Sequence, residues 1–177
     1  MAHRSLTAGY TLVELMVVLA IFGIVLGLAV PGFQSLIRKQ QLATVTGELF
    51  AAVTLTRAEA IRRSQRVDLV PTDGQDWANG WMVFVDENGN RRLDPGEKII
   101  HAQSLVARGI TIKSAMTDSA RPYIAYTGSG RTRTDANGQT PQAGHLALSF
   151  GDQQRRIVLN FLGRPRACNP ATDAACG

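Results

Sequence analysis

The feature that most constrains this chain is a run of 19 residues near its N-terminus, residues 12–30, in which Glu14 is the only charged side chain. As an α-helix rising 1.5 Å per residue, the run is about 28 Å long, close to the hydrocarbon thickness of a bilayer. A buried core helix would carry a polar stripe. A cleaved secretory signal would end in a small-residue cleavage site, whereas a helix-like pattern continues here through residues 31–37. The run therefore predicts a retained single-pass transmembrane helix over residues 10–31.

The residues at the start of this run form a more specific pattern. The stretch AGYTLVE, residues 8–14, resembles the processing site of type IV pilins and type II secretion pseudopilins, with tyrosine in place of the usual phenylalanine. In those families a membrane peptidase cuts after the glycine and methylates the new N-terminal amine. The resemblance implies that residues 1–9 are a prepilin leader peptide and that prepilin peptidase is a partner. It also implies cleavage between Gly9 and Tyr10 and methylation of Tyr10.

Glu14 is the fifth residue after the implied cut. An ionised carboxylate within an apolar span costs roughly 2.5–3.5 kcal/mol on insertion scales unless it is paired. We expect the positive amine of Tyr10 in a neighbouring subunit to pair with it, so that Glu14 acts in assembly with other pilin or pseudopilin subunits. The alternative is a glutamate near the membrane edge whose side chain simply extends toward water.

Beyond the apolar run, residues 32–66 repeat apolar or small side chains at steps of three and four, with most charged side chains elsewhere around the helix. This pattern predicts an amphipathic continuation of the helix to about Arg66, with one face covered by a domain. The small residues in it do not form the heptad seam of a free coiled coil. The expected inward face consists of Phe33, Leu36, Ile37, Thr44, Gly47, Phe50, Val53, Thr54, Ala58 and Ile61.

From Val67 onward the pattern changes to two-residue alternation, interrupted by clusters of Gly, Asp, Asn and Pro. Short strands without helices between them predict an α+β fold, in which an antiparallel sheet packs on the helix. Residues 67–177 are expected to form this β-rich head, which ends in a basic strand and a disulfide loop. The predicted strands are residues 67–70, 81–85, 98–102, 110–113, 123–126, 145–150 and 156–161.

The tryptophan-containing hairpin of residues 77–97 resembles the FimT/FimU/GspH branch of minor pilins and pseudopilins. The resemblance implies a type IV pilin-like fold. It also implies a single pass through the inner membrane, a periplasmic head, and assembly into a pilus or pseudopilus.

Within that hairpin, residues 86–97 space their oxygen-bearing side chains like a calcium loop, with glutamate in the twelfth place. Arg91 stands where such loops require glycine, and Arg92 adds a second positive charge that opposes a divalent ion. We predict a hydrogen-bonded strand connection and no metal, with calcium binding as the alternative. The candidate ligands are Asp86, Asn88, Asn90, Asp94 and Glu97.

The residues point to no enzyme and no cofactor. His101 and His145 lie inside strand patterns, and residues 128–130 are too short for a nucleophile elbow. The sequence also lacks a phosphate loop and a dinucleotide-binding fingerprint. We therefore predict no catalytic residues.

The C-terminal third carries the strongest charge signal. Arginine supplies 16 of the 19 cationic residues. Residues 121–166 hold seven arginines and two aspartates, so the net charge of this stretch is +5, the same as that of the whole chain. A local positive field of this kind is the usual footprint of a polyanion. The seven are Arg121, Arg131, Arg133, Arg155, Arg156, Arg164 and Arg166.

The stretch GRPR, residues 163–166, resembles the Gly-Arg-x-Arg motif of FimT proteins, which bind DNA in natural transformation. The resemblance implies double-stranded DNA, bound without sequence preference, as a partner of Gly163, Arg164 and Arg166. A turn at Gly163 and an extended Pro165 would place the two arginines within roughly 7 Å of each other. Further contacts are expected from Arg131, Arg133, Arg155 and Arg156, and the alternative is a solvated strand end.

Cys168 and Cys176 follow this motif. Outside the cytoplasmic membrane a disulfide is permitted, and closing so short a loop would stabilise the fold by about 2.5 kcal/mol in the chain-entropy model. The sequence as a whole predicts a non-enzymatic minor pilin that binds extracellular DNA for uptake. The alternative is a structural subunit without DNA binding, either a GspH-type pseudopilin of type II secretion or a FimU-like assembly subunit.

Overall fold

The computed structural model describes residues 9–135 and 140–176, apart from the side chains of residues 28–32. The chain divides into two compact units, Met1–Ile37 and Arg38–Gly177. Most of the predicted leader, residues 1–8, lies outside the described residues.

The long helix α1 (Leu12–Arg63) begins in the first unit and ends in the second. Thr11 caps its start, because the Thr11 Oγ1 accepts a hydrogen bond of 3.2 Å from the Glu14 backbone amide. Among the residues that the structure describes, no helix is both long and apolar enough to cross a membrane. The transmembrane segment at residues 10–31 stays a prediction.

The helix ends three residues before the predicted Arg66. Ser64 adopts a left-handed conformation with φ of 54°, and its amide donates to the Ile61 carbonyl oxygen at 3.2 Å. A left-handed residue of this kind is a common way to terminate an α-helix. Arg66 is therefore free to turn its side chain toward the first strand instead of continuing the helical surface.

The half of α1 that lies in the second unit buries one face against the head, but not the predicted face. Leu42, Val45 and Leu49 are buried, whereas Thr44 and Gly47 are exposed. The predicted row lies two residues further along the helix, which is roughly 200° around its axis. The core takes the row with the larger aliphatic side chains, because these bury more apolar area. Of the predicted face, Val53 is buried and Phe50 is half-buried, and Phe33, Leu36, Ile37, Thr54, Ala58 and Ile61 are exposed.

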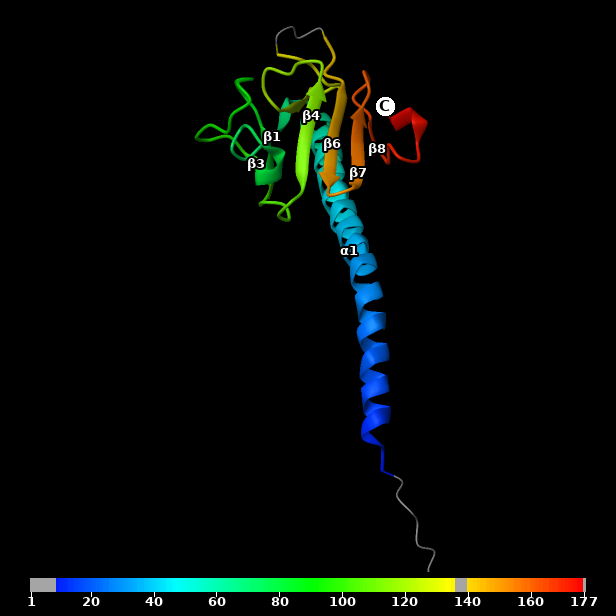
Figure 1. Cartoon of the computed structure of the whole chain (residues 1–177). Coiled ribbons are helices and arrows are strands. Elements are labelled where there is room, and N and C mark those ends of the chain that lie inside the picture. The colour runs from blue at the N-terminus through cyan, green and yellow to red at the C-terminus, as the bar shows by residue number, and fades with distance from the viewer. Residues whose placement is uncertain (1–8, 136–139, 177) are drawn as a thin grey trace, which may run out of the picture. The chain divides into compact units, whose positions relative to one another are not determined.

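The head contains two four-stranded antiparallel sheets (Figure 1). The first has the order β3-β2-β1-β5, and its strands are β1 (Val67–Pro71), β2 (Trp81–Val85), β3 (Ile99–Gln103) and β5 (Ile124–Tyr126). The second has the order β4-β6-β7-β8, and its strands are β4 (Thr111–Met116), β6 (Gly144–Phe150), β7 (Gln153–Leu159) and β8 (Pro165–Cys168). Two short 3₁₀ helices, η1 (Trp77–Asn79) and η2 (Ala174–Cys176), complete the described elements. The α+β prediction is confirmed.

All seven predicted strands are present, and β8 is an additional strand that was not predicted from the sequence. The predicted strand at residues 156–161 corresponds to β7, which begins and ends earlier because a turn occupies residues 160–163.

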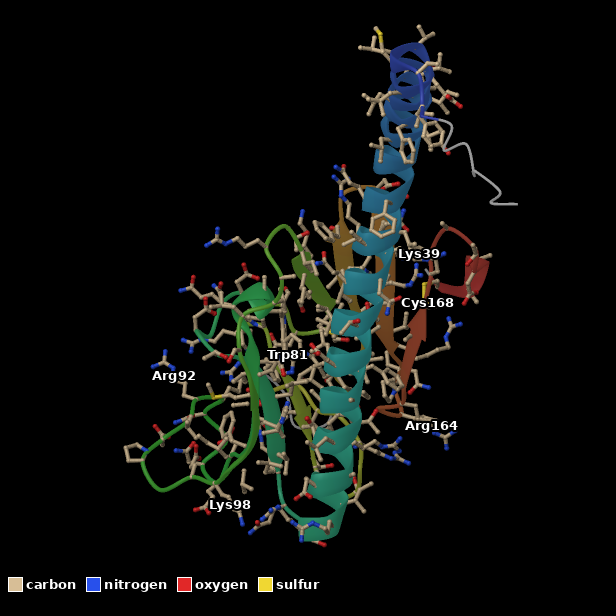
Figure 2. All side chains as sticks on the ribbon, turned by 90° about the horizontal axis from the view of Figure 1, so that it is seen from below. Lys39, Trp81, Arg92, Lys98, Arg164 and Cys168 are labelled. Atoms are coloured by element: carbon tan, nitrogen blue, oxygen red, sulfur yellow. A yellow bond between two sulfur atoms is a disulfide. The ribbon has the colours of Figure 1, made fainter. Side chains whose placement is uncertain are left out.

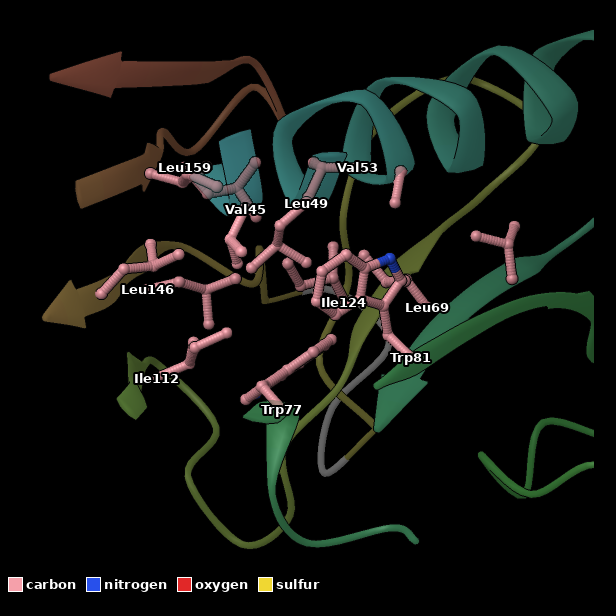
Figure 3. Close-up of a cluster of buried hydrophobic side chains, with 14 of the residues drawn as sticks. Val45, Leu49, Val53, Leu69, Trp77, Trp81, Ile112, Ile124, Leu146 and Leu159 are labelled. Atoms are coloured by element: carbon pink, nitrogen blue, oxygen red, sulfur yellow. The ribbon is translucent and has the colours of Figure 1, made fainter. Parts of the chain in front are cut away.

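One hydrophobic core joins the helix to both sheets (Figure 3). Val45, Leu49 and Val53 of α1 point into it, and their partners come from both sheets and η1. These partners include Leu69, Trp77, Trp81, Ile112, Ile124, Leu146 and Leu159. The helix thus fixes the second sheet in place, and with it the edge strand β8 and the preceding turn, which together carry the arginine motif.

Candidate nucleic-acid interface

A tight turn connects β7 to β8 and presents the arginine motif. Asn160 organises it: its Oδ1 accepts hydrogen bonds from the amides of Leu162 at 3.0 Å and Arg164 at 2.9 Å. The Asn160 carbonyl oxygen also accepts from the Gly163 amide at 2.9 Å. With its backbone satisfied in this way, the turn is preorganised to hold Arg164 at its exit.

Gly163 seats this turn against the first sheet. Its φ of 74° lies in the left-handed region, where a side chain is strained. A Cβ added here would lie 3.0 Å from Cε1 of Tyr126 and 3.1 Å from the amide nitrogen of Thr132. The Gly163 carbonyl oxygen accepts a hydrogen bond of 2.7 Å from the Tyr126 hydroxyl. The close approach therefore requires glycine.

The segment that follows β5 brings further arginines to this turn. Thr132 forms a β-bridge with Tyr126, so the segment lies directly against Gly163. Arg131 is exposed at this point, and the Arg133 Nη1 donates to the Thr132 carbonyl oxygen at 3.0 Å. The structure thus brings Arg131 and Arg133 next to the turn that carries the motif, and their contact with DNA stays a prediction.

Arg57 of α1 also belongs to this region and was not predicted from the sequence. Its Nε donates a hydrogen bond of 3.0 Å to the carbonyl oxygen of Gly130, 73 residues further along the chain. In the structure the Arg57 side chain is half-buried on α1. Only the pairing of distant segments shows that it supports the loop with Arg131.

The face of the second sheet that points away from α1 carries a second group of cations. Arg166 lies opposite Val158, which in turn lies opposite His145. Arg156 lies opposite Ala147, which lies opposite Lys113. Residues directly opposite each other point to the same face of a sheet. The outer-face cations are therefore Lys113, Arg156 and Arg166, with His145 among them.

Arg155 does not belong to that group. It lies opposite the buried Leu148, on the face of the sheet that points toward the helix, and its Nη1 donates to the Gln154 carbonyl oxygen at 2.9 Å. The adjacent arginines of β7 therefore point to opposite faces, as alternation along a strand requires.

A disulfide between Cys168 and Cys176 closes a loop beside β8, as predicted (Figure 2). This loop binds two of the arginines. Arg166 pairs with Asp173 through its Nη1 at 2.8 Å and also contacts the Ala175 carbonyl oxygen, and Arg156 donates to the Cys176 carbonyl oxygen at 3.1 Å.

Arg164 differs from these tethered arginines. It is exposed and makes no side-chain hydrogen bond or ion pair with any residue that the structure describes. Its backbone is nevertheless fixed by Asn160. Figure 2 shows Arg164 and Cys168 along the same edge of the head. The motif therefore presents one free guanidinium and one guanidinium held by the disulfide loop.

Burial lowers the pKa of His145, and the nearby positive charge of Arg156 lowers it further. His145 therefore carries less positive charge than an ordinary histidine, and the main cations of the outer face are Lys113, Arg156 and Arg166.

Comparison with known proteins decides the family. The model of the Type II transport protein GspH family matches residues 45–163, and that of the prokaryotic N-terminal methylation motif matches residues 4–30. The chain belongs to the GspH family. Members of this family are structural pilin and pseudopilin subunits, and the family and the N-terminal motif together indicate a pilus or pseudopilus component with an N-terminal anchor.

Several relatives support this membership. The chain is 36% identical to the pilin-like protein PilA1 of Thermus thermophilus over 89% of its own length and 96% of that protein. It is 42% identical to a type IV major fimbrial protein FimA of Dichelobacter nodosus over 70% of its own length and 73% of that protein.

Solved structures share the fold of this GspH-family chain. The type IV minor pilin FimU of Pseudomonas aeruginosa matches with a TM-score of 0.59 at 17% identity, over 76% of this chain and 92% of that one. The minor pseudopilin EpsH of Vibrio cholerae matches with a TM-score of 0.52 at 15% identity, over 73% of this chain and 98% of that one. The type IV pilin-like fold is confirmed.

The loop of residues 86–97 uses its oxygens to hold its own backbone in this GspH-family head. Asp86 accepts from the amides of Gly89 at 2.7 Å and Arg91 at 2.9 Å, and Glu97 accepts from the amides of Glu87 at 3.0 Å and Asp94 at 2.9 Å.

The side chains within this loop also bind one another. Asn88 and Asn90 both donate their side-chain amides to Asp94. In the described part of the chain, no group of three or more His, Cys, Asp or Glu residues is arranged to hold a metal ion. The arrangement is a hydrogen-bonded strand connection.

A buried ionic cluster beneath this loop was not predicted. Arg66 pairs with Asp68 at 2.7 Å and Asp135 at 2.9 Å, and reaches Asp86 at 3.5 Å, while Arg91 also pairs with Asp135. Burial raises the pKa of Asp68 to about 7, against the opposing charge of Arg66. The available sequence signal was an aspartate inside the apolar strand VDLV, because a charge buried in a strand requires a partner.

Proposed function

We propose that this GspH-family protein is a non-enzymatic minor pilin of a type IV pilus, which binds extracellular double-stranded DNA for uptake in natural transformation. The observation that carries the proposal is the rigid β7–β8 turn, which holds the backbone of Arg164 by a hydrogen bond while its guanidinium is exposed and unpaired among the described residues. An arginine with a fixed backbone and a free guanidinium suits a ligand that offers phosphate oxygens at a regular spacing.

The positive charges around the turn extend this surface. Arg131 and Arg133 come from the adjoining segment, and Arg156 and Arg166 from the outer face of the second sheet. Guanidinium groups form paired hydrogen bonds with phosphate oxygens. Contacts of this kind read the DNA backbone and not its sequence, and a single subunit would bind with a dissociation constant on the order of 10⁻⁴–10⁻⁶ M at physiological salt.

We infer the N-terminal processing from the methylation motif over residues 4–30. Prepilin peptidase would cut between Gly9 and Tyr10 and methylate Tyr10, and residues 10–31 would then hold the subunit in the inner membrane with its head in the periplasm. Glu14 lies in the first turn of α1, where it would pair with the N-terminal amine of a neighbouring subunit during assembly.

The second candidate is a structural subunit without DNA binding, either a type II secretion pseudopilin or a FimU-like assembly subunit. The pairing of Arg166 with Asp173 favours it, because that contact gives one motif arginine a structural role within the head. Under this alternative, Arg166 fixes the disulfide loop, and Arg164 is a solvated side chain.

The deciding experiment measures DNA binding by fluorescence anisotropy, with the purified full chain in a nonionic detergent and a short labelled duplex. R164Q and R166Q together should weaken binding by roughly tenfold or more, since each phosphate contact contributes to the electrostatic free energy of binding. R108Q is the matched control, because Arg108 is an exposed arginine between β3 and β4, outside the proposed interface. Equal loss in both proteins, or none in the double variant, would favour the structural subunit.

A further inference from the structure

The tip of the β7–β8 turn exposes two large apolar side chains. Phe161 is 69% exposed and Leu162 is 49% exposed. The other aromatic residues that the structure describes in the Arg38–Gly177 unit are buried or half-buried, so Phe161 stands apart from them. The proposed contact of arginines with phosphates does not use either side chain.

The hydrogen bonds of the turn backbone hold both side chains outward. The Leu162 amide donates to Asn160 Oδ1 at 3.0 Å, and the turn is closed by the hydrogen bond of Gly163 to the Asn160 carbonyl oxygen at 2.9 Å. Gly163 is itself locked against Tyr126. A turn fixed at so many points keeps Phe161 from folding back onto the core. Because the turn is already ordered, binding of a ligand to it has a low entropic cost.

The charges around this apolar tip indicate its ligand. Arg164 follows Phe161 by three residues, and Arg131 lies on the segment packed against Gly163. An exposed aromatic ring between cations is the combination that binds single-stranded nucleic acids, in which a base stacks on the ring and the flanking phosphates meet the positive charges. A neighbouring protein subunit would explain the apolar side chains but not the unpaired guanidinium beside them.

We propose that Phe161 is a stacking platform for an unpaired base, so that the site prefers single-stranded DNA, or the frayed end of a duplex, to intact duplex. This inference rests on the proposed function and adds single-stranded DNA and frayed duplex ends to the double-stranded DNA proposed there. Bases inside a duplex already stack on one another and offer Phe161 no free face. To use the ring on a duplex, the protein would have to insert it as a wedge and unstack a base step.

The test uses the full chain in nonionic detergent, with labelled oligothymidylate and a blunt, GC-rich duplex as probes. F161A should weaken binding of the single strand by about tenfold and change binding of the duplex by less than twofold. F161Y keeps the ring and should retain most of the single-strand affinity. Equal affinity of F161A and wild type for the single strand would overturn the proposal, as would an F161A variant that loses self-association but not DNA binding.

A fluorescence measurement provides a second readout. Both native tryptophans, Trp77 and Trp81, are buried at 1% and 0% exposure, so a tryptophan at position 161 would be the solvent-exposed one. Emission of F161W should be quenched by oligothymidylate. L105W is the control, because Leu105 is 72% exposed between β3 and β4, away from β8. Binding without quenching of F161W overturns the stacking platform.

The two proposals fail in distinguishable ways. If wild type binds neither probe at low salt, the proposed DNA-binding function fails, and this inference fails with it. If wild type binds both probes through Arg164 but F161A matches it on both, the stacking platform alone fails.

Discussion

The Tyr126 hydroxyl donates a 2.7 Å hydrogen bond to the Gly163 carbonyl oxygen, which joins the last strand of the first sheet to the turn that carries the arginine motif. Tyr126 is fully buried, and this burial raises the pKa of its hydroxyl far above its ordinary value, against a smaller opposing effect of Arg57. The hydroxyl is therefore a donor at every physiological pH. The position of Arg164 thus depends on residues nearly 40 positions earlier in the chain.

This relationship predicts that G163A destabilises the head. An alanine at φ of 74° is strained by about 1 kcal/mol, and its Cβ would meet Tyr126 at 3.0 Å and the Thr132 amide at 3.1 Å. We expect the free energy of unfolding, measured with urea on the full chain, to fall by about 2 kcal/mol.

The matched control for G163A is G47A. Gly47 lies on an exposed side of α1 with open space around its missing Cβ. Alanine there should stabilise the protein by about 0.5–1 kcal/mol. If G163A unfolded at the same urea concentration as wild type, the close approach of the turn to Tyr126 would be wrong.

The buried ionic cluster predicts a pH dependence of stability. The carboxylates of Asp68, Asp86 and Asp135 share the guanidinium groups of Arg66 and Arg91. Because three negative charges face two positive charges, protonation of one carboxylate stabilises the folded state. Burial raises the pKa of Asp68 from 3.8 to about 7. The folded state therefore binds this proton more tightly than the unfolded state, and the resulting stability is present below about pH 4 and lost as the pH rises to about 7.

D68N removes this titration, so the comparison isolates it from other groups. The free energy of unfolding of wild type minus that of D68N should decrease between about pH 4 and pH 7 and be level above that range. Denaturant titrations at a series of pH values measure it. A difference that is constant over this range, or that increases with pH, would show that Asp68 is ionised in the folded protein throughout.

The pairing of Arg166 with Asp173 predicts that D173N tightens DNA binding. The ion pair at 2.8 Å is partly exposed, with 48% and 35% of the side chains accessible, so it holds Arg166 by less than about 1 kcal/mol. Releasing it should strengthen affinity about twofold to fivefold. D152N is the control, because Asp152 is an exposed aspartate on the turn after β6. An equal gain in D152N would mean that net charge alone sets the affinity.

The methylation motif predicts the mass of the mature protein. Intact mass spectrometry of the chain purified from its native membrane should show a first residue at Tyr10 with one added methyl group, since the motif spans residues 4–30. G9A should block processing and leave the precursor. An unprocessed wild-type chain that begins at Met1, or one that begins beyond Pro31, would contradict the proposed anchor.

The periodicity of apolar residues predicted the positions of the helix and strands better than it predicted which face of the helix is buried. The change from helical spacing to alternation at Val67 located the first strand, because each regular structure imposes its own period. The prediction of the buried face of α1 was wrong, because small residues such as Gly47 and Ala58 fit either side of the helical wheel. Strand β8 was missed because four residues that include a proline and an arginine show no alternation, and its register with β7 defines it.

The arginine segment shows the same limit at the candidate site. The sequence indicates a positive stretch, but it does not show which cations share a surface. Pairing in the sheet separates Arg155 from Arg156, and the folded disulfide loop engages Arg166. These relationships depend on contacts between distant residues, as does the position of Arg57 beside Gly130.

The salt dependence of DNA affinity tests the central claim most directly. For the full chain and a labelled duplex, the slope of log affinity against log salt should be shallower by about 2 in the variant R164Q with R166Q than in wild type, at roughly 0.9 for each phosphate that the variant no longer neutralises. The same slope in R108Q and wild type would show that the change is local. Identical slopes in wild type and the double variant would contradict the assignment of these two arginines to the DNA backbone.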